Sequence, residues 1–266
     1  MTEKVTDMGY VSVKNLSFAY EEGKTILDCI DLDIGRGDFI CILGQSGCGK
    51  STLIRLIAGL EVPTVGTVHI DGKEVTEASL DRGVVFQDYG LFPWMTAGKN
   101  ILLALEQKYP KRKKSELKNI VLDRLKEVGL DKSVYNKYPR ELSGGMQQRC
   151  AIAQALSIES PILLMDEPFG ALDAVTRASL QDMVRNLLEG ENKKTVFFVT
   201  HDVDEALLLG SRIIVLGQSP SRIIYSCEID KDNRPTRETQ FTHPEFLEMR
   251  NRLIGYINRD VAEKLK

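Results

Sequence analysis

A glycine-rich segment that ends in a lysine and a serine has the composition of a phosphate-binding loop. It reads Gly44-Gln45-Ser46-Gly47-Cys48-Gly49-Lys50-Ser51 and matches the pattern G-x-x-x-x-G-K-[ST]. The glycines allow successive backbone amides to point at phosphate oxygens, and the start of a following helix adds further amides. Lys50 would reach the β- and γ-phosphates, and the Ser51 hydroxyl would bind Mg²⁺. A surface turn with a solvated lysine is disfavoured, because an apolar strand precedes the segment and a helical pattern follows it.

Two adjacent acids follow a second apolar run, Ile162–Met165. In open α/β sheets ligands bind at the carboxyl ends of the strands, which is where Asp166 and Glu167 would lie. Asp166 would hold Mg²⁺, directly or through water, and Glu167 could polarise the water that attacks a phosphate. Alone, the pair could equally cap a strand before Pro168. Beside a phosphate-binding loop, the catalytic interpretation is favoured.

A second helix start also has the character of an anion site. Leu142-Ser143-Gly144-Gly145-Met146-Gln147 places a serine, which is a favoured N-cap residue, before two glycines whose amides are unobstructed. This segment begins more than ninety positions after Lys50, within a region of helical pattern. Taken by itself, it could be an ordinary helix cap.

The order of the predicted elements indicates how these motifs are positioned. Val11–Phe18 and Ile26–Ile34 alternate as half-buried antiparallel strands do, and Gly66–Val75 contains an Asp-Gly hairpin turn. Strands and helices then alternate, as in an α/β fold with a mostly parallel sheet. Ile101–Ile158 reads as a helical insertion, and Pro244–Leu265 as a terminal amphipathic helix. The sequence therefore predicts a P-loop NTPase core, an N-terminal antiparallel β subdomain and an inserted helical subdomain.

Composition limits the classes of partner. The formal net charge is −3, from 35 basic and 38 acidic residues, which argues against a nucleic-acid backbone as the main partner. The longest apolar runs are too short to span a membrane, and the N-terminus lacks a signal-peptide pattern. Five cysteines without C-x-x-C spacing are typical of a reducing compartment. The basic run Lys111–Lys114 is interpreted as a solvated loop and helix start.

The motifs, taken in order, resemble those of the nucleotide-binding subunits of ATP-binding-cassette (ABC) transporters. The resemblance rests on the phosphate-binding loop, the Leu142–Gln147 segment, the Asp166-Glu167 pair, the loop Gly170-Ala171-Leu172-Asp173 and His201. It implies a head-to-tail dimer in which the phosphate-binding loop of one copy faces Ser143 of the other. ATP binding would close this dimer, and hydrolysis would release it. Domain boundaries expected from it are 10–240 for the ATPase domain, about 98–158 for the inserted helical subdomain and 241–266 for a C-terminal helical extension.

The resemblance also assigns roles to individual residues. It implies that Gln87 contacts Mg²⁺ and the attacking water, that His201 binds the γ-phosphate, and that Asp173 senses the partner copy. Tyr20 would stack on adenine, although a half-buried core tyrosine is a competing interpretation. The expected catalytic residues are Lys50, Gln87, Glu167 and His201, and the expected Mg²⁺ ligands are Ser51, Gln87 and Asp166. The expected nucleotide contacts are Tyr20, Gly44, Gln45, Ser46, Gly47, Cys48, Gly49, Lys50, Ser51, Thr52, Ser143, Gly144, Gly145, Gln147 and Asp173.

The run Phe92-Pro93-Trp94-Met95-Thr96 is similar to the ATPases of nitrate, sulfonate, taurine and bicarbonate importers. Trp94 could face a groove for a permease helix, or it could anchor the core of the helical insertion. The resemblance implies a subunit on the cytoplasmic face of the membrane, bound to a permease and served indirectly by an extracytoplasmic solute-binding protein. Importers of pyrimidine-type vitamin precursors and non-transport ABC ATPases remain alternatives. A P-loop kinase or GTPase would leave Ser143 and His201 unexplained.

Overall fold

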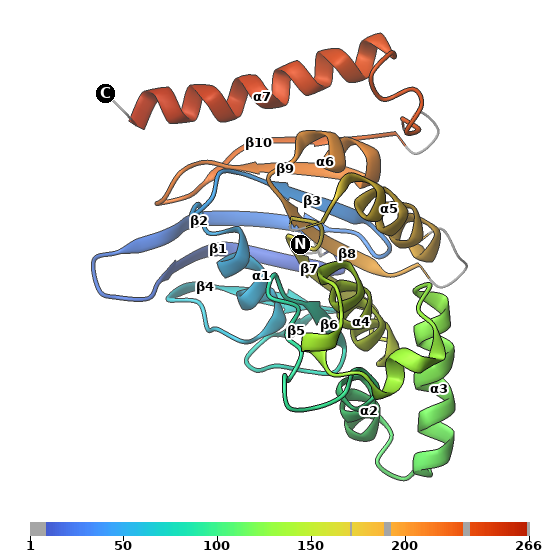
Figure 1. Ribbon diagram of the computed structural model, residues 1–266. Helices are drawn as coiled ribbons and strands as arrows, with labels where there is room; N and C mark the ends of the chain where they lie inside the picture. Colours follow the sequence, from blue (N-terminus) through green and yellow to red (C-terminus); the bar gives the residue numbers. More distant parts are fainter. Residues whose placement is uncertain (1–8, 171, 189–192, 231–234, 265–266) are drawn as a thin grey trace, which may run out of the picture. The chain divides into compact units, whose positions relative to one another are not determined.

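The computed structural model describes residues 9–170, 172–188, 193–230 and 235–264 (Figure 1). The chain divides into two compact units. Unit 1 comprises Met1–Ser79 together with Thr195–Lys266, and unit 2 comprises Leu80–Lys194. Each unit carries part of the predicted site.

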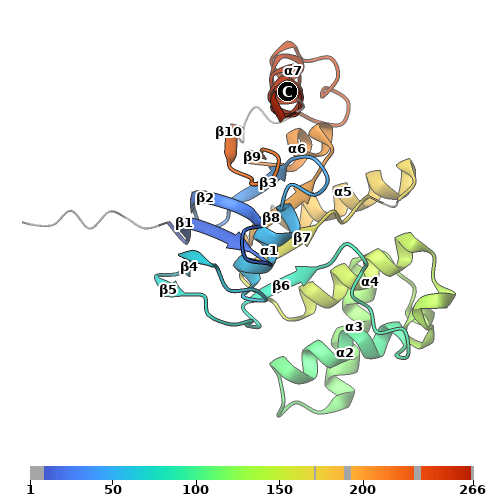
Figure 2. The same ribbon diagram turned by 90° about the vertical axis from the view of Figure 1, so that its left-hand side faces the viewer.

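Unit 1 contains an antiparallel sheet of four strands in the order β2-β1-β4-β5. These are Thr25–Ile34 (β2), Val11–Ala19 (β1), Val65–Ile70 (β4) and Lys73–Glu74 (β5). Apolar side chains alternate along β1 and β2, so one face of the sheet is buried, as the sequence pattern predicts. Figure 2 shows the four strands as one layer.

A second set of strands in unit 1 supports the phosphate-binding loop. Phe39–Leu43 (β3) lies between Thr195–Thr200 (β8) and Arg212–Leu216 (β9), parallel to both. Ile223–Glu228 (β10) pairs with β9 in the antiparallel direction. All residues of β3 and β8 are buried, which accounts for their continuous apolar runs.

Three helices complete unit 1. Lys50–Ala58 (α1) follows β3 and contacts β8, while Val203–Leu209 (α6) follows β8. Pro244–Lys264 (α7) packs against α6, β9 and β10, along which it lies in Figure 1.

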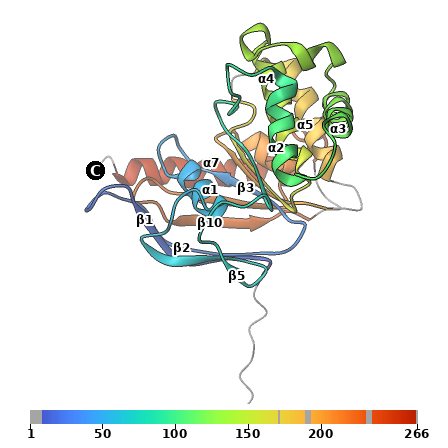
Figure 3. The ribbon, with the colours of Figure 1, turned by 90° about the horizontal axis from the view of Figure 1, so that it is seen from below.

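Unit 2 combines two parallel strands with a group of helices. The strands are Arg82–Val85 (β6) and Ile162–Asp166 (β7). The helices are Ala97–Lys108 (α2), Lys114–Glu127 (α3), Gly144–Ser157 (α4) and Ala174–Leu188 (α5), with short 3-10 turns at Lys132–Asn136 (η1) and Pro139–Glu141 (η2). α2, α3 and α4 contact one another around buried apolar residues, and Figure 3 shows them as one group.

The predicted fold class is confirmed: the chain has an α/β core with mostly parallel strands, an antiparallel β layer and a helical insertion. The exposed run Lys111–Lys114 forms a loop and helix start, as expected. Sequence analysis did not identify β6, η1 or η2. In the described part of the chain, no helix combines the length and apolar character needed to cross a membrane.

Candidate functional site

The phosphate-binding loop joins β3 to α1 in unit 1. Gly47 and Gly49 have φ angles of 81° and 94°, which side-chain-bearing residues rarely adopt. A Cβ on Gly49 would lie 2.8 Å from a methyl carbon of Leu27, so glycine is required there for space as well. The Lys50 side chain is only 4% exposed, and its Nζ donates to the carbonyl oxygens of Gly44 and Gln45, both at 2.9 Å. The lysine is therefore held against the loop by the backbone of the loop itself.

The other residues of the phosphate-binding loop differ in how far they are exposed to solvent. Gln45, Ser46 and Gly47 are exposed at the tip, Ser51 is half-buried, and Thr52 is buried in the first turn of α1. Cys48 is 1% exposed, and burial raises the pKa of its thiol, although the nearby Lys50 charge acts in the opposite direction.

The turn between β9 and β10 forms hydrogen bonds to the loop. The hydroxyl of Ser221, which is fully buried, donates to the carbonyl oxygens of Cys48 and Gly217, the latter at 2.8 Å. The side chain of Gln218 donates to Gln45 Oε1 at 3.2 Å. Sequence analysis did not identify Ser221 or Gln218, because neither belongs to a motif and both lie more than 160 positions from the loop.

His201 lies beside this loop because of strand register. Leu43 of β3 pairs with Thr200 of β8, so the phosphate-binding loop and His201 begin at neighbouring strand ends. The Thr200 hydroxyl donates to Glu205 Oε2 at 2.6 Å and accepts from the Asp202 amide at 3.0 Å. The exposed His201 is thus carried on a turn that is fixed on both sides.

Tyr20 follows β1 in unit 1. Its ring is 54% exposed and meets Phe18 edge-on, with 4.8 Å between ring centroids. The core-tyrosine interpretation is wrong. The exposed Tyr20 ring, packed edge-on against Phe18, is available for stacking on another ring.

In unit 2, strand register brings the amide and the two acids together. Val85 of β6 pairs with Met165 of β7, so Gln87 and the Asp166-Glu167 pair follow neighbouring strand ends. Asp166 is buried, whereas Gln87 is exposed. Glu167 has a φ angle of 43°, a strained conformation of a kind that clusters at functional sites.

The second predicted anion site also lies in unit 2. Ser143 caps α4, and its hydroxyl accepts from the Met146 amide at 3.3 Å. A Cβ on Gly145 would lie 2.7 Å from the Thr176 side chain, and one on Gly144 would lie 3.1 Å from the Tyr89 hydroxyl. The Gln147 side chain donates to the Leu142 carbonyl at 3.2 Å, which ties the helix start to the preceding residue.

Asp173 caps the start of α5. Its Oδ1 accepts from the amides of Val175 and Thr176 at 3.1 and 3.0 Å. Hydrogen bonds from Thr176 lower the pKa of the exposed Asp173 carboxyl. Ala171, in the same predicted loop, lies outside the described residues.

The aromatic run before α2 is exposed. Trp94 is 70% exposed and lies 5.3 Å from Phe92, measured between ring centroids. The core-anchor interpretation of Trp94 is therefore wrong. The buried Asn100, which sequence analysis missed, holds this segment by accepting from the Phe92 amide and donating to the carbonyls of Phe92, Met95 and Thr96.

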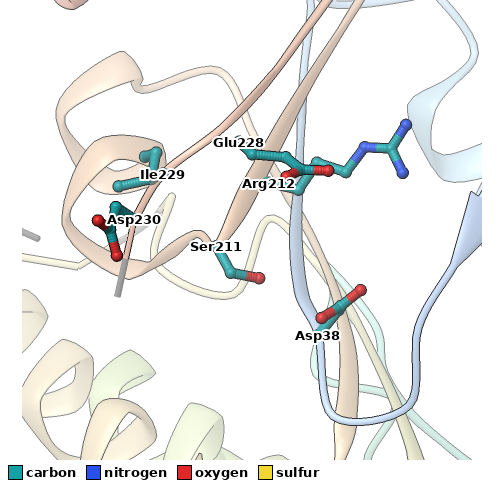
Figure 4. Close-up of a pocket in the computed structure, with 6 residues that line it drawn as sticks. All are labelled: Asp38, Ser211, Arg212, Glu228, Ile229 and Asp230. Carbon is teal, nitrogen blue, oxygen red and sulfur yellow. The ribbon is translucent and has the colours of Figure 1, made fainter. Parts of the chain in front are cut away.

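A cavity of about 560 Å³ opens in unit 1 near the N-terminal ends of β3 and β9. Its described lining residues are Asp38, Ser211, Arg212, Glu228, Ile229 and Asp230 (Figure 4). In Figure 4 the Arg212 guanidinium points away from Asp230, and it donates to the Asp33 carbonyl at 2.8 Å. None of the predicted nucleotide contacts is among these lining residues, which lie at the end of β3 opposite to the phosphate-binding loop.

The structure thus gathers the predicted residues into two groups. Unit 1 holds Tyr20, the 44–52 segment and His201; unit 2 holds Gln87, Ser143–Gln147, Asp166, Glu167 and Asp173. Ser51, Gln87 and Asp166 offer hydroxyl, amide and carboxylate oxygens, which are ligand types that Mg²⁺ accepts. Among the described residues there is no cluster of three or more histidine, cysteine or acidic side chains for a metal, and Mg²⁺ on a nucleotide does not need one.

Comparisons with known proteins identify the family of this chain. The sequence family described as "ABC transporter" matches residues 27–170. The bicarbonate transport ATP-binding protein CmpC of Synechococcus elongatus is 45% identical over 96% of this chain, which spans 39% of that relative. The nitrate import ATP-binding protein NrtD of the same organism is 42% identical over 89% of this chain and 86% of its own length.

A solved structure, a dimeric post-hydrolysis state of the ATP-binding cassette MJ0796 bound to ADP and Pi, superposes with a TM-score of 0.76. It is 36% identical and covers 83% of this chain and 99% of its own. The motifs, the fold and these relatives lead to one conclusion: the chain belongs to the ABC transporter family and is an ATP-binding cassette of the ATP-hydrolysing type.

Proposed function

We propose that this chain binds and hydrolyses MgATP as the motor subunit of an importer. The observation that carries the proposal is the β3–β8 register, in which Leu43 pairs with Thr200. It puts a phosphate-binding loop and a histidine at neighbouring strand ends, where α/β sheets bind ligands. We further propose the boundaries given by the sequence: 10–240 for the ATPase domain, about 98–158 for the helical subdomain and 241–266 for the extension.

Each residue has a distinct task in this proposal. Lys50 neutralises charge on the β- and γ-phosphates, and His201 donates a hydrogen bond to the γ-phosphate. Ser51, Gln87 and Asp166 would hold Mg²⁺, and Glu167 would accept a proton from the attacking water. Bound Mg²⁺ would neutralise charge on the phosphate oxygens. Catalysis by the chain itself consists of positioning and charge stabilisation, without a covalent intermediate.

We propose that two copies close head to tail on two nucleotides. Ser143, Gly144, Gly145 and Gln147 would then meet the γ-phosphate held by the partner copy, at the amino end of α4. Asp173 would lie near the contact between copies. The dimeric form of the MJ0796 cassette supports this assembly.

The exposed Phe92–Trp94 segment supports a permease as the membrane partner. A fixed loop that presents two aromatic rings is suited to receive an apolar helix from another protein. The chain would then lie on the cytoplasmic face of the membrane, and an extracytoplasmic solute-binding protein would act only through the permease.

A small anion is the proposed solute class. CmpC is named for bicarbonate transport and NrtD for nitrate import, and both relatives match most of this chain. A sulfonate such as taurine belongs to the same class. A pyrimidine-type vitamin precursor remains the alternative solute, and a non-transport ABC ATPase the alternative function.

Two measurements test the proposal. The first is MgATP hydrolysis by the chain and by Lys50→Ala, which should lose nearly all turnover. The second is isolation of the chain from gently solubilised native membranes, followed by identification of the proteins that accompany it. A multi-span permease would support the importer. Recovery with ribosomal or DNA-associated proteins only would leave a dimeric ATPase and refute the transport role.

A further inference from the structure

The face of α7 that packs on the rest of unit 1 contains charged residues within an apolar stripe. Phe246, Arg250, Leu253, Ile257 and Asp260 are spaced by four and three positions, so they share one face of the helix. Phe246 and Leu253 are buried, as expected for a packed face. Arg250 and Asp260 are ten positions apart, about 15 Å along the axis, and each contacts a different segment of unit 1.

Asp260 contacts the turn that supports the phosphate-binding loop. Its carboxylate accepts from the Gln218 amide at 2.7 Å, and the Gln218 side chain donates to Gln45 in the loop. A Cβ on Gly217 would lie 2.9 Å from the Asp260 carboxylate, so the helix and the turn are in close contact. Ser221, in the same turn, donates to the Cys48 carbonyl. One short segment therefore connects α7 with two residues of the loop.

Arg250 contacts the helix that begins after His201. Its Nε and Nη2 donate to the two carboxylate oxygens of Asp204 at 2.7 and 3.4 Å. Asp204 lies in the first turn of α6, which Asp202 caps by accepting from the Asp204 and Glu205 amides. This two-point contact on Asp204 restricts the start of α6 and, through the Asp202 cap, the turn that carries His201.

We propose that α7 positions both nucleotide-facing segments of unit 1, with Asp260 acting on the phosphate-binding loop and Arg250 acting on the His201 turn. The inference rests on the proposed function, because its effect is read in ATP binding and hydrolysis. Asp260 and Arg250 are positioning residues, and neither is expected to touch the nucleotide.

The two contacts should affect different steps. Gln45 belongs to the loop that binds phosphate, so loss of the Asp260 contact should weaken ATP binding. His201 is assigned to the γ-phosphate during hydrolysis, so loss of the Arg250 contact should lower turnover. The Arg250 and Asp204 side chains are 36% and 31% exposed, and such partly solvated pairs add little to stability. Loss of the Arg250–Asp204 pair should therefore change ATP turnover with little change in the free energy of unfolding.

The test uses the full chain with Asp260→Ala, Arg250→Ala and a matched control, Glu248→Ala. Glu248 forms an exposed ion pair with Arg252 on the same helix, so its removal perturbs α7 without touching either contact. We expect Asp260→Ala to raise the Kd for ATP about tenfold with little change in kcat, and Arg250→Ala to lower kcat about tenfold with little change in Kd. Asp260→Asn retains an acceptor for the Gln218 amide and should restore most of the affinity.

Measurements on the wild-type chain distinguish failure of the proposed function from failure of the role of α7. If it neither binds nor hydrolyses MgATP, the proposed function fails. If it does both, and Asp260→Ala and Arg250→Ala match it in Kd and kcat, the role of α7 is overturned. Equal losses in Glu248→Ala would also overturn it, because they would reflect general weakening of the helix. If Asp260→Ala does not fold, Gln218→Ala removes the side-chain bond to Gln45 and should raise the Kd instead. If Arg250→Ala does not fold, Asp204→Ala removes the same ion pair and should lower kcat. Wild-type values in these variants would overturn the role of α7.

Discussion

Leu43 and Thr200 pair across adjacent parallel strands, and this one register fixes where the phosphate-binding loop and His201 begin. The strands are buried throughout, so a slip of one position would exchange the side chains packed on the two faces and disrupt close packing on both. Thr200 extends the constraint beyond its own strand, because its hydroxyl bonds to Glu205 and to the Asp202 amide. The position of an exposed histidine is thus set by the buried core.

His201→Ala should lower the rate of ATP hydrolysis by about a hundredfold, because a donor aimed at transferring phosphate is lost. ATP binding should change little, since Lys50 and the loop amides remain. Turnover and nucleotide affinity are measured on the same preparation. His243→Ala, at another exposed histidine, is the matched control and should behave as wild type. Wild-type turnover in His201→Ala would remove the histidine from the mechanism.

Gly49→Ala should lower the free energy of unfolding by about 3 kcal/mol. About 1–2 kcal/mol would come from the left-handed backbone and the rest from overlap with Leu27 and Ile26. Gly72→Ala is the control: its φ angle is 73°, but no described atom lies within 4 Å of the added Cβ, so only the backbone cost applies. Denaturant unfolding measures both. Equal losses would show that the loop can relax around the new methyl group.

Cys48 should react slowly with a maleimide compared with the exposed Cys29. Because burial raises the pKa of the Cys48 thiol, the reactive thiolate is scarce near pH 7 and becomes abundant only above the ordinary value of about 8.5. We expect Cys48 labelling at pH 7 to be at least about tenfold slower and to keep rising with pH beyond about 8.5.

Mass spectrometry of peptides measures the labelling of each cysteine. The variant Cys29→Ser is a control in which the fast-reacting exposed thiol is absent. Complete modification of Cys48 should block ATP binding, since the added group must occupy space beneath the loop. Unchanged ATP affinity in fully modified protein would contradict this.

Much of the fold was readable from the sequence because its signals are local. The helical pattern expected after the phosphate-binding loop is α1, Lys50–Ala58, which a glycine loop precedes and which Gly59 ends in a left-handed conformation. Strand β6 was missed because its four residues, Arg82–Val85, are too few to show a period.

The predicted site motifs were found from residue types and their spacing. The residues that hold these motifs in place in the fold were not. Ser221 lies 173 positions from Cys48, and Asp260 lies 42 positions from Gln218, so no sequence period connects either pair. Burial of Tyr20 and Trp94 was also undecidable, because aromatic residues suit both cores and interfaces. Only the fold separates those cases.

Glu167→Gln should retain MgATP binding and lower steady-state turnover by about a hundredfold or more, because an amide cannot accept the proton of the attacking water. ATP should then hold two copies together, and light scattering should report a dimer that persists while nucleotide is bound. Glu116→Gln, at an exposed position in α3, is the control and should turn over normally. Retained turnover in Glu167→Gln would exclude Glu167 as the proton acceptor.

Asn100→Ala should free the Phe92–Trp94 segment and lower the free energy of unfolding by about 2 kcal/mol, because the partly buried Phe92 amide and carbonyl lose their side-chain partner. Asn119→Ala, on the exposed face of α3, should stay within about 0.5 kcal/mol of wild type. If the aromatic segment receives a permease helix, Asn100→Ala should also weaken recovery of the permease while ATP binding by the isolated chain is unchanged. Normal permease recovery with reduced stability would assign Asn100 a structural role only and place the docking surface elsewhere.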